Sequence, residues 1–220
     1  MKKSLLILLL FIFSPFLHSQ NIVDFFYLIP EEQVDGLNHT ERKELIKNGS
    51  LAKDDMLYSL DLDQQNGYLK LDQSYTEGQS GYQIFEMTYW NLKDKKLIAL
   101  SSIGGSNGGF SQSDFKFFEY KSKKLIELRT GYLKSYTSNF EVFINNLVGE
   151  FTKPNVSQAV KEDLLVAQFT IELPKTGKDI IVSFKDNYMA SPDFFDKNYS
   201  KYIITKKKIY FWDSDKEVFK

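Results

Sequence analysis

The chain has 220 residues, in which 28 lysines and arginines nearly balance 29 aspartates and glutamates for a formal net charge of −1. This balance argues against nucleic acid as a partner, because proteins that bind it carry a basic surface that neutralises phosphates. With no cysteine and only two histidines, the chain offers neither a cysteine nucleophile nor a zinc site built from cysteine and histidine. We therefore expect no metal and no cofactor.

Residues 1–19 have the pattern of a signal peptide. A short positively charged start precedes an apolar run over residues 5–13, which Pro15 then ends. A membrane-spanning helix needs about 20 apolar residues, so the run is too short to be an anchor. A lipoprotein would carry a cysteine at the cleavage point, where this chain has Ser19 and Gln20. We predict cleavage after Ser19 and an exported protein, periplasmic or secreted and not a lipoprotein, with no transmembrane segment in the mature chain.

Short helices are predicted at the start of the mature chain. From Asn21 onward, apolar residues recur every three or four positions, which places them on one helical face. Pro30 ends this first run. A second helix is predicted to begin at Asn38, an N-cap residue with Glu41 at capping-box spacing, and to close at Asn48-Gly49.

Residues 51–129 alternate with a period close to two and predict an antiparallel meander. Strands at 56–63 and 68–75 flank Asn66-Gly67, a hairpin signal because both turn residues tolerate a positive φ. Both faces of residues 81–92 are apolar, so this strand is expected to be covered on both sides. The later strands are expected at 97–103, 114–120 and 125–129, with lysine-rich turns at 93–96 and 121–124 and a glycine-rich loop at 104–109.

The second half of the chain predicts one helix followed by further strands. Ser138 and Glu141 have capping-box spacing, and an apolar helical stripe follows them and ends at Gly149. Strands are expected at 165–173, 180–184 and 202–212, with a turn or helix from Ser191-Pro192. The fold class is therefore α+β and mainly β: an antiparallel meander sheet, sandwich-like or open-barrel-like, with two short N-terminal helices and one mid-chain helix. We expect a single β-rich domain over residues 20–220.

Apparent catalytic motifs fail in their sequence context. Ser50-Leu51-Ala52-Lys53 has the Ser-x-x-Lys spacing of penicillin-binding proteins, but it follows a helix stop and enters a strand. The glycines at 104–109 lack the Lys-Ser/Thr pair and the helix that a phosphate-binding loop needs. The run from Asp61 to Gly67 has its glycine one position late for a calcium loop. No catalytic residue is predicted.

One resemblance covers most of the mature chain. It is carried by Phe25-Phe26, Ile29-Pro30, Glu41-Arg42-Lys43, Leu45-Ile46 and the closing Ile209-Tyr210-Phe211-Trp212. This layout resembles small exported β-rich domains of unknown function from Gram-negative bacteria. The resemblance implies a secreted or periplasmic location and no assigned catalytic residue.

The sequence leaves open two classes of function. The first is a non-catalytic binding or assembly module of the cell envelope, whose partner is an envelope protein, a lipid or a glycan, because aromatic side chains suit such surfaces and the chain has 19 Phe and 13 Tyr. The second is a carboxylate-based hydrolase with an extracellular or periplasmic substrate, because Asp and Glu are the only abundant acid–base groups. Paired buried carboxylates in a cleft would favour the enzyme, and an open apolar groove would favour binding.

The candidate binding residues lie in the glycine-rich stretch. A hairpin needs only two turn residues such as Asn-Gly, so two glycine pairs exceed what the turn requires. Mobile surface loops tolerate extra residues, so the default interpretation is slack with no further use. The functional alternative is that the loop caps a binding surface, with Phe110 as its apolar contact. The candidate residues are Gly104, Gly105, Ser106, Asn107, Gly108, Gly109 and Phe110.

Overall fold

The structure, a computed structural model, describes residues 20–76, 81–106, 109–166, 168–185 and 194–220. The predicted signal peptide at residues 1–19 lies outside the described residues.

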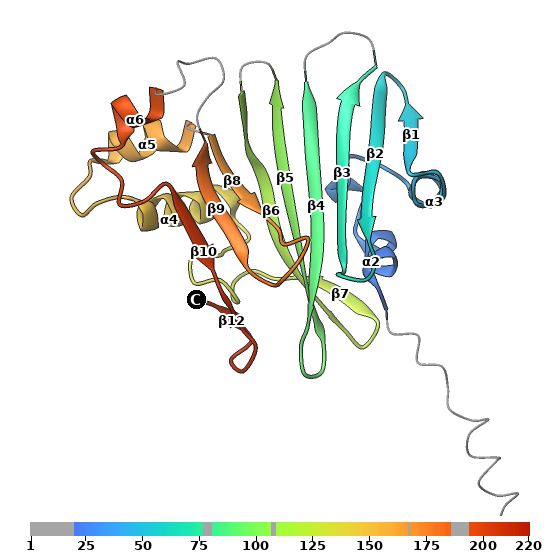
Figure 1. The fold of residues 1–220 in the computed structure, drawn as a ribbon. Helices are drawn as coiled ribbons and strands as arrows, with labels where there is room; N and C mark the ends of the chain where they lie inside the picture. The colour runs from blue at the N-terminus through green and yellow to red at the C-terminus, as the bar shows by residue number, and fades with distance from the viewer. Residues whose placement is uncertain (1–19, 77–80, 107–108, 167, 186–193) are drawn as a thin grey trace, which may run out of the picture.

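A seven-stranded antiparallel sheet forms the centre of the fold, with its strands in chain order from β1 to β7 (Figure 1). This confirms the predicted mainly β fold and its meander. Within the described residues the two outer strands, β1 and β7, each pair with one neighbour only, so the sheet is open and does not close into a barrel. The strands are β1 (Ser50–Lys53), β2 (Met56–Asp63), β3 (Tyr68–Tyr75), β4 (Tyr82–Asn91), β5 (Lys96–Ser106), β6 (Gly109–Lys121) and β7 (Lys124–Glu127).

The β2–β3 hairpin has the predicted boundaries. Asp63 pairs with Tyr68, and Gly67 takes a φ of +70° in the turn. The Asp63 carboxylate accepts the backbone N–H of Asn66 at 3.0 Å and the side-chain amide of Asn66 at 2.7 Å. Because these bonds are local, the Asn66-Gly67 signal was sufficient to predict the hairpin and its boundaries.

The N-terminal helices cover one face of the sheet. Helix α2 (Ile22–Leu28) begins with a capping box at Asn21, a 3-10 helix η1 (Glu31–Gln33) follows, and α3 (His39–Asn48) has the predicted capping box at Asn38. Gly49 ends α3 in the left-handed region, with a φ of +75°. We call the apolar cluster on this face the N-terminal core; it includes Phe25, Phe26, Leu37, Leu45, Leu69, Phe85, Met87, Ile98 and Phe118.

The second half of the chain covers the opposite face of the sheet. A small sheet of order β10-β9-β8 packs there together with α4 and α5 (Figure 1). The C-terminal core on this face includes Trp90, Leu97, Ala99, Phe115, Phe117, Phe143, Phe151, Phe169 and Val182. The elements are α4 (Phe140–Phe151), α5 (Gln158–Val166), β8 (Gln168–Glu172), β9 (Ile180–Lys185), α6 (Phe194–Tyr199), β10 (Lys207–Tyr210), β11 (Trp212–Asp213) and β12 (Val218–Phe219).

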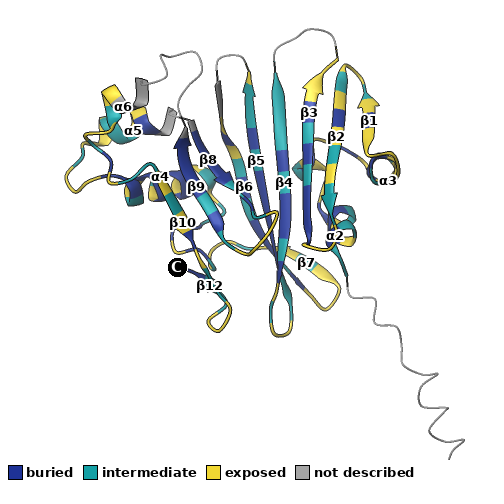
Figure 2. Cartoon of the chain, in the orientation of Figure 1, coloured by how far each residue is buried: buried dark blue, intermediate teal, exposed yellow. Residues whose placement is uncertain are grey.

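Strand β4 lies between the two cores. Phe85 and Met87 are buried in the N-terminal core, and Trp90 is buried in the C-terminal core. Figure 2 shows the resulting band of buried residues along the middle of the sheet. The prediction that this strand is covered on both faces is confirmed.

Several boundaries in the second half differ from the predictions. The N-cap of α4 is Asn139 and not Ser138, and the helix continues past Gly149 because Phe151 is buried in the C-terminal core. Helix α5 was not predicted; its Leu164 is fully buried, so tertiary packing supports it. The expected strand at 202–212 is divided, since Ile203 bridges to Thr152 at the end of α4 and only β10 and β11 are regular.

Candidate functional site

The predicted glycine-rich loop is mostly strand. Gly104, Gly105 and Ser106 end β5, while Gly109 and Phe110 begin β6. Ser106 pairs with Gly109, so only Asn107 and Gly108 connect the strands, and both lie outside the described residues. A Cβ at Gly104 would lie 3.9 Å from Cβ of Ser113, an ordinary contact. The expectation of a loop at 104–109 was therefore wrong, while the binding role of these residues stays a prediction.

Glu86 is the carboxyl group most relevant to the hydrolase alternative. It lies on β4, where burial raises its pKa although two hydrogen bonds act in the opposite direction. Its Oε1 accepts the hydroxyl of Tyr68 at 2.7 Å, and its Oε2 accepts the backbone N–H of Leu173 at 3.0 Å. Both carboxyl oxygens are thus bonded within the protein, and the group connects the end of β8 to the main sheet.

Two further polar side chains connect β8 to the main sheet. The Ser101 hydroxyl donates to the carbonyl of Ile171 at 2.7 Å, and the Gln112 Oε1 accepts the N–H of Ile171 at 2.8 Å. Gln112 also donates to the Ser101 hydroxyl at 2.8 Å. Gln112 faces this core because a β-bulge at Ser113 shifts the pairing of β5 and β6 by one residue. The cluster satisfies the edge of β8 that β9 does not pair, which is buried against the main sheet, and it has a structural role.

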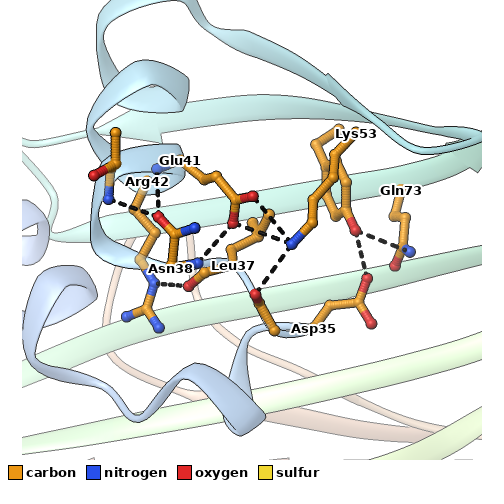
Figure 3. Close-up of polar contacts among 10 residues, drawn as sticks. Asp35, Leu37, Asn38, Glu41, Arg42, Lys53 and Gln73 are labelled. Carbon is orange, nitrogen blue, oxygen red and sulfur yellow. Dashed lines mark hydrogen bonds and ion pairs between the residues drawn. The ribbon is translucent and has the colours of Figure 1, made fainter.

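A second buried polar cluster joins the N-terminal helices, and Figure 3 shows its contacts. Arg42 is 1% exposed, and burial lowers the pKa of its guanidinium. It donates to the carbonyls of Leu37 at 2.7 Å, Phe26 at 2.7 Å and Ile29 at 2.6 Å. Since helix ends leave carbonyls without intrahelical partners, Arg42 supplies the donors that the end of α2 requires.

The outer part of the Figure 3 cluster is also structural. Lys53 forms an ion pair with Glu41 at 3.1 Å and donates to the carbonyl of Gly36 at 3.2 Å. The Tyr58 hydroxyl donates to Asp35 at 2.7 Å, and burial raises the pKa of that hydroxyl. A cavity beside Asp35 has a volume of about 10 Å³, room for one water molecule at most. The cluster leaves no space for a larger ligand.

The lysine-rich turns lie side by side at one end of the sheet. The β4–β5 and β6–β7 connections are neighbours because Lys96 at the start of β5 pairs with Tyr120 near the end of β6 (Figure 1). This end of the sheet is opposite the 104–110 stretch, because β5 runs from one to the other. The lysines gathered there are Lys93, Lys95, Lys96, Lys121, Lys123 and Lys124.

A depression of about 300 Å³ opens between these turns and the start of the described chain. We call it the lysine depression; its lining includes Gln20, Asn91, Lys95, Lys96, Tyr120 and Lys121. Lys95 forms an ion pair with Glu119 at 2.7 Å, and Lys121 forms one with Asp94. The pair with Glu119 raises the pKa of Lys95.

Unlike Lys95 and Lys121, which also line the depression, Lys96 has no carboxylate partner among the described residues. Its ammonium group lies 4.7 Å from the ring centre of Tyr89 and donates to Oδ1 of Asn91 at 2.6 Å. Burial lowers the pKa of Lys96. A half-buried cation held by an amide oxygen and an aromatic ring can accept an anion without breaking an ion pair.

A second depression adjoins the first. This tyrosine depression has a volume of about 390 Å³. It is lined by Tyr27, Leu28, His39 and Tyr120, together with Gln20, Asp24 and Lys123. Gln20 and Tyr120 line both depressions, and the Gln20 amide donates to the Tyr120 hydroxyl at 2.7 Å. The lysine depression presents mainly cationic donors, and the tyrosine depression adds aromatic and apolar surface with Lys123 and one acid, Asp24. The Asp24 carboxylate accepts the backbone N–H of Asn21 at 2.8 Å.

Comparison with known proteins gives no match to a family model, a curated protein or a solved structure. Within the part of the chain that the structure describes, no three His, Asp or Glu side chains gather in a way that could hold a metal ion. Over the same residues, no helix has the length and apolar character to cross a membrane.

The lysine-rich segments were predicted only as turns, not as part of a site. Their proximity could have been predicted, because alternate turns of an antiparallel meander lie at the same end of the sheet. The turns at 93–96 and 121–124 are separated by two strands, so they had to be neighbours. Gln20 and Tyr27, which complete the site, come from a helical segment whose docking position no sequence pattern indicates.

Proposed function

We propose that this protein is an exported, non-catalytic binding module of the cell envelope and that its ligand occupies the adjoining lysine and tyrosine depressions. Lys96 carries this proposal. Removing an ammonium group from water costs free energy unless an anion or hydrogen bonds compensate it. Lys96 is half-buried without a carboxylate beside it in the described residues, as expected for a group that awaits an anionic ligand. Export rests on the signal-peptide pattern of residues 1–19.

The hydrolase alternative has one observation in its favour. A general acid needs a raised pKa, and burial raises the pKa of Glu86. Binding is favoured over hydrolysis because the oxygens of Glu86 are bonded to Tyr68 and Leu173, and because Glu86 lines neither depression.

A ligand-recovery experiment tests the proposed function. The purified protein is mixed with aqueous and lipid extracts of the cell envelope and separated by gel filtration, and mass spectrometry identifies what remains bound. We expect one compound to stay with the wild type and to be lost from Lys96→Met, which keeps the aliphatic chain but removes the charge. Lys43→Met, at an exposed position on α3, is the matched control.

Two outcomes would contradict the proposal. One is that no envelope compound is retained, and the other is that Lys96→Met retains the same compounds as the wild type. Hydrolysis of an envelope glycan or ester that is abolished by Glu86→Gln would instead establish the enzymatic alternative.

A further inference from the structure

Building on the function proposed above, we infer that the ligand carries a phosphate group, held in the lysine depression, and that its uncharged part lies in the tyrosine depression. Hydrogen-bond donors face the first depression, and aromatic side chains line the second.

The lysine depression is rich in hydrogen-bond donors. Ammonium groups, side-chain amides and hydroxyls face it, and Asp94 is the one acid among its lining residues. That acid is already paired with Lys121. The lining donors are Lys95, Lys96, Lys121, Gln20, Asn91, Tyr120 and Ser122. An acceptor with several oxygens can use this set, whereas a cation would find little to bind.

The cations at the lysine depression suit a phosphate better than a carboxylate. Lys96 has no anion in the described part of the chain, and the Lys121–Asp94 pair is exposed on both sides, at 49% and 58%. Exposed pairs of this kind contribute only about 0–1 kcal/mol, so Lys121 can turn to a ligand at low cost. A phosphate carries up to two negative charges and strong acceptor oxygens, and lysine binds it as a point charge without needing the planar fork of arginine.

The tyrosine depression offers room for the rest of such a ligand. Tyr27 packs edge-on against His39 at 5.1 Å between ring centres, and Leu28 is 47% exposed beside them. Because aromatic rings and a leucine provide apolar area with polar edges, they suit a sugar ring or a similar flat group. The shared residues Gln20 and Tyr120 place this surface directly next to the phosphate position.

Isothermal titration calorimetry with defined probes tests the inference. The probes are inorganic phosphate, glucose 6-phosphate, glucose, and vesicles of phosphatidylglycerol or of phosphatidylcholine. We expect glucose 6-phosphate to bind more tightly than inorganic phosphate and glucose not to bind. Lys96→Met should weaken binding about tenfold, the loss of one charge-assisted hydrogen bond, and Lys43→Met should not change it.

A thermal melt separates a binding role from a structural one. Lys96→Met removes a half-buried charge, so its melting temperature should equal or exceed that of the wild type. A marked fall in melting temperature would show that Lys96 holds the fold and would overturn its role as an anion anchor. Binding of phosphatidylglycerol vesicles, without binding of the soluble phosphates, would support the phosphate chemistry and assign it to a lipid headgroup.

Failure of this inference is distinguishable from failure of the proposed function. If the envelope extract yields a Lys96-dependent ligand that lacks phosphate, the binding function stands and the phosphate assignment is wrong. If all phosphate probes fail and the extract yields no ligand, both are wrong.

Discussion

Glu86 and Tyr68, on adjacent strands, share a hydrogen bond of 2.7 Å within a largely buried setting, and burial raises the pKa of both side chains. A carboxyl whose pKa is higher in the folded state than in the unfolded state adds to the free energy of unfolding when it is protonated. That contribution is complete below the unfolded pKa, near 4.5, and is lost as the pH rises through the folded pKa. Ionised Glu86 therefore lowers the free energy of unfolding at neutral pH.

Glu86→Gln should remove this pH dependence. The glutamine oxygen can accept the N–H of Leu173 and its amide can donate to Tyr68, so both contacts remain. We expect the variant and the wild type to have similar free energies of unfolding near pH 4 and the variant to be the more stable at pH 7.5. Urea unfolding at a series of pH values measures this, with Glu44→Gln at an exposed position as the control. A wild type that gains stability over the variant as the pH rises would contradict it.

Arg42→Ala should be strongly destabilising. The change leaves three buried carbonyls without their donor and empties the space that the guanidinium fills. We expect a loss of about 3–5 kcal/mol in the free energy of unfolding. Arg129, the other arginine of the chain, is exposed, so Arg129→Ala should change stability by no more than about 0.5 kcal/mol. Equal effects of the two substitutions in chemical denaturation would show that the Arg42 bonds contribute nothing specific.

Gly67→Ala and Gly177→Ala separate backbone strain from a steric clash. Both glycines have a positive φ, of +70° and +83°, so each alanine should cost about 1–2 kcal/mol. Only at Gly67 would the new Cβ meet a neighbour, at 2.6 Å from the Tyr89 ring, while nothing lies within 4 Å at Gly177. We therefore expect Gly67→Ala to cost about 1–3 kcal/mol more than Gly177→Ala in thermal or urea unfolding.

The Gly67 substitution has a second expected effect. The Tyr89 ring that must move also lies 4.7 Å from the ammonium of Lys96, so binding at the lysine depression should weaken as well. A Gly67→Ala protein that is no less stable than Gly177→Ala would show that Tyr89 moves aside freely.

Gln112→Ala should loosen β8 from the main sheet. The variant loses the bond to the N–H of Ile171 and leaves the Ser101 hydroxyl with one partner fewer. We expect a loss of about 2 kcal/mol in stability and faster hydrogen exchange at the Ile171 amide. Ser111→Ala, on the other side of Gln112 and exposed, is the matched control. Unchanged exchange at Ile171 in the Gln112→Ala protein would rule out this role.

Elements stabilised by neighbours in the chain were predictable. The Asn66-Gly67 turn and the Asn38 capping box each depend on contacts within three residues, so their boundaries could be read from the sequence. Alternation also predicted the meander and the two covered faces of β4, because each strand contacts its sequence neighbours.

Contacts between distant segments were not predictable. Arg42 has the sequence context of an exposed helical residue, and only the docking of α2 reveals its carbonyl partners. Strict alternation would turn Gln112 to the N-terminal core, but the bulge at Ser113 reverses its direction. The lysine depression joins Gln20 to residues about one hundred positions later in the chain, a distance that no local pattern encodes.

The polar contacts that join β8 to the main sheet also affect whether separate molecules of this protein associate. Unpaired N–H and C=O groups along a sheet edge can template the addition of a strand from another chain, which begins aggregation. At β8 the N–H and C=O of Ile171 are bonded to Gln112 and Ser101, and the N–H of Leu173 that follows is bonded to Glu86. A second molecule therefore finds these groups already occupied by side chains of the same chain. Ser101, Gln112 and Glu86 thus protect this edge against self-association as the protein accumulates.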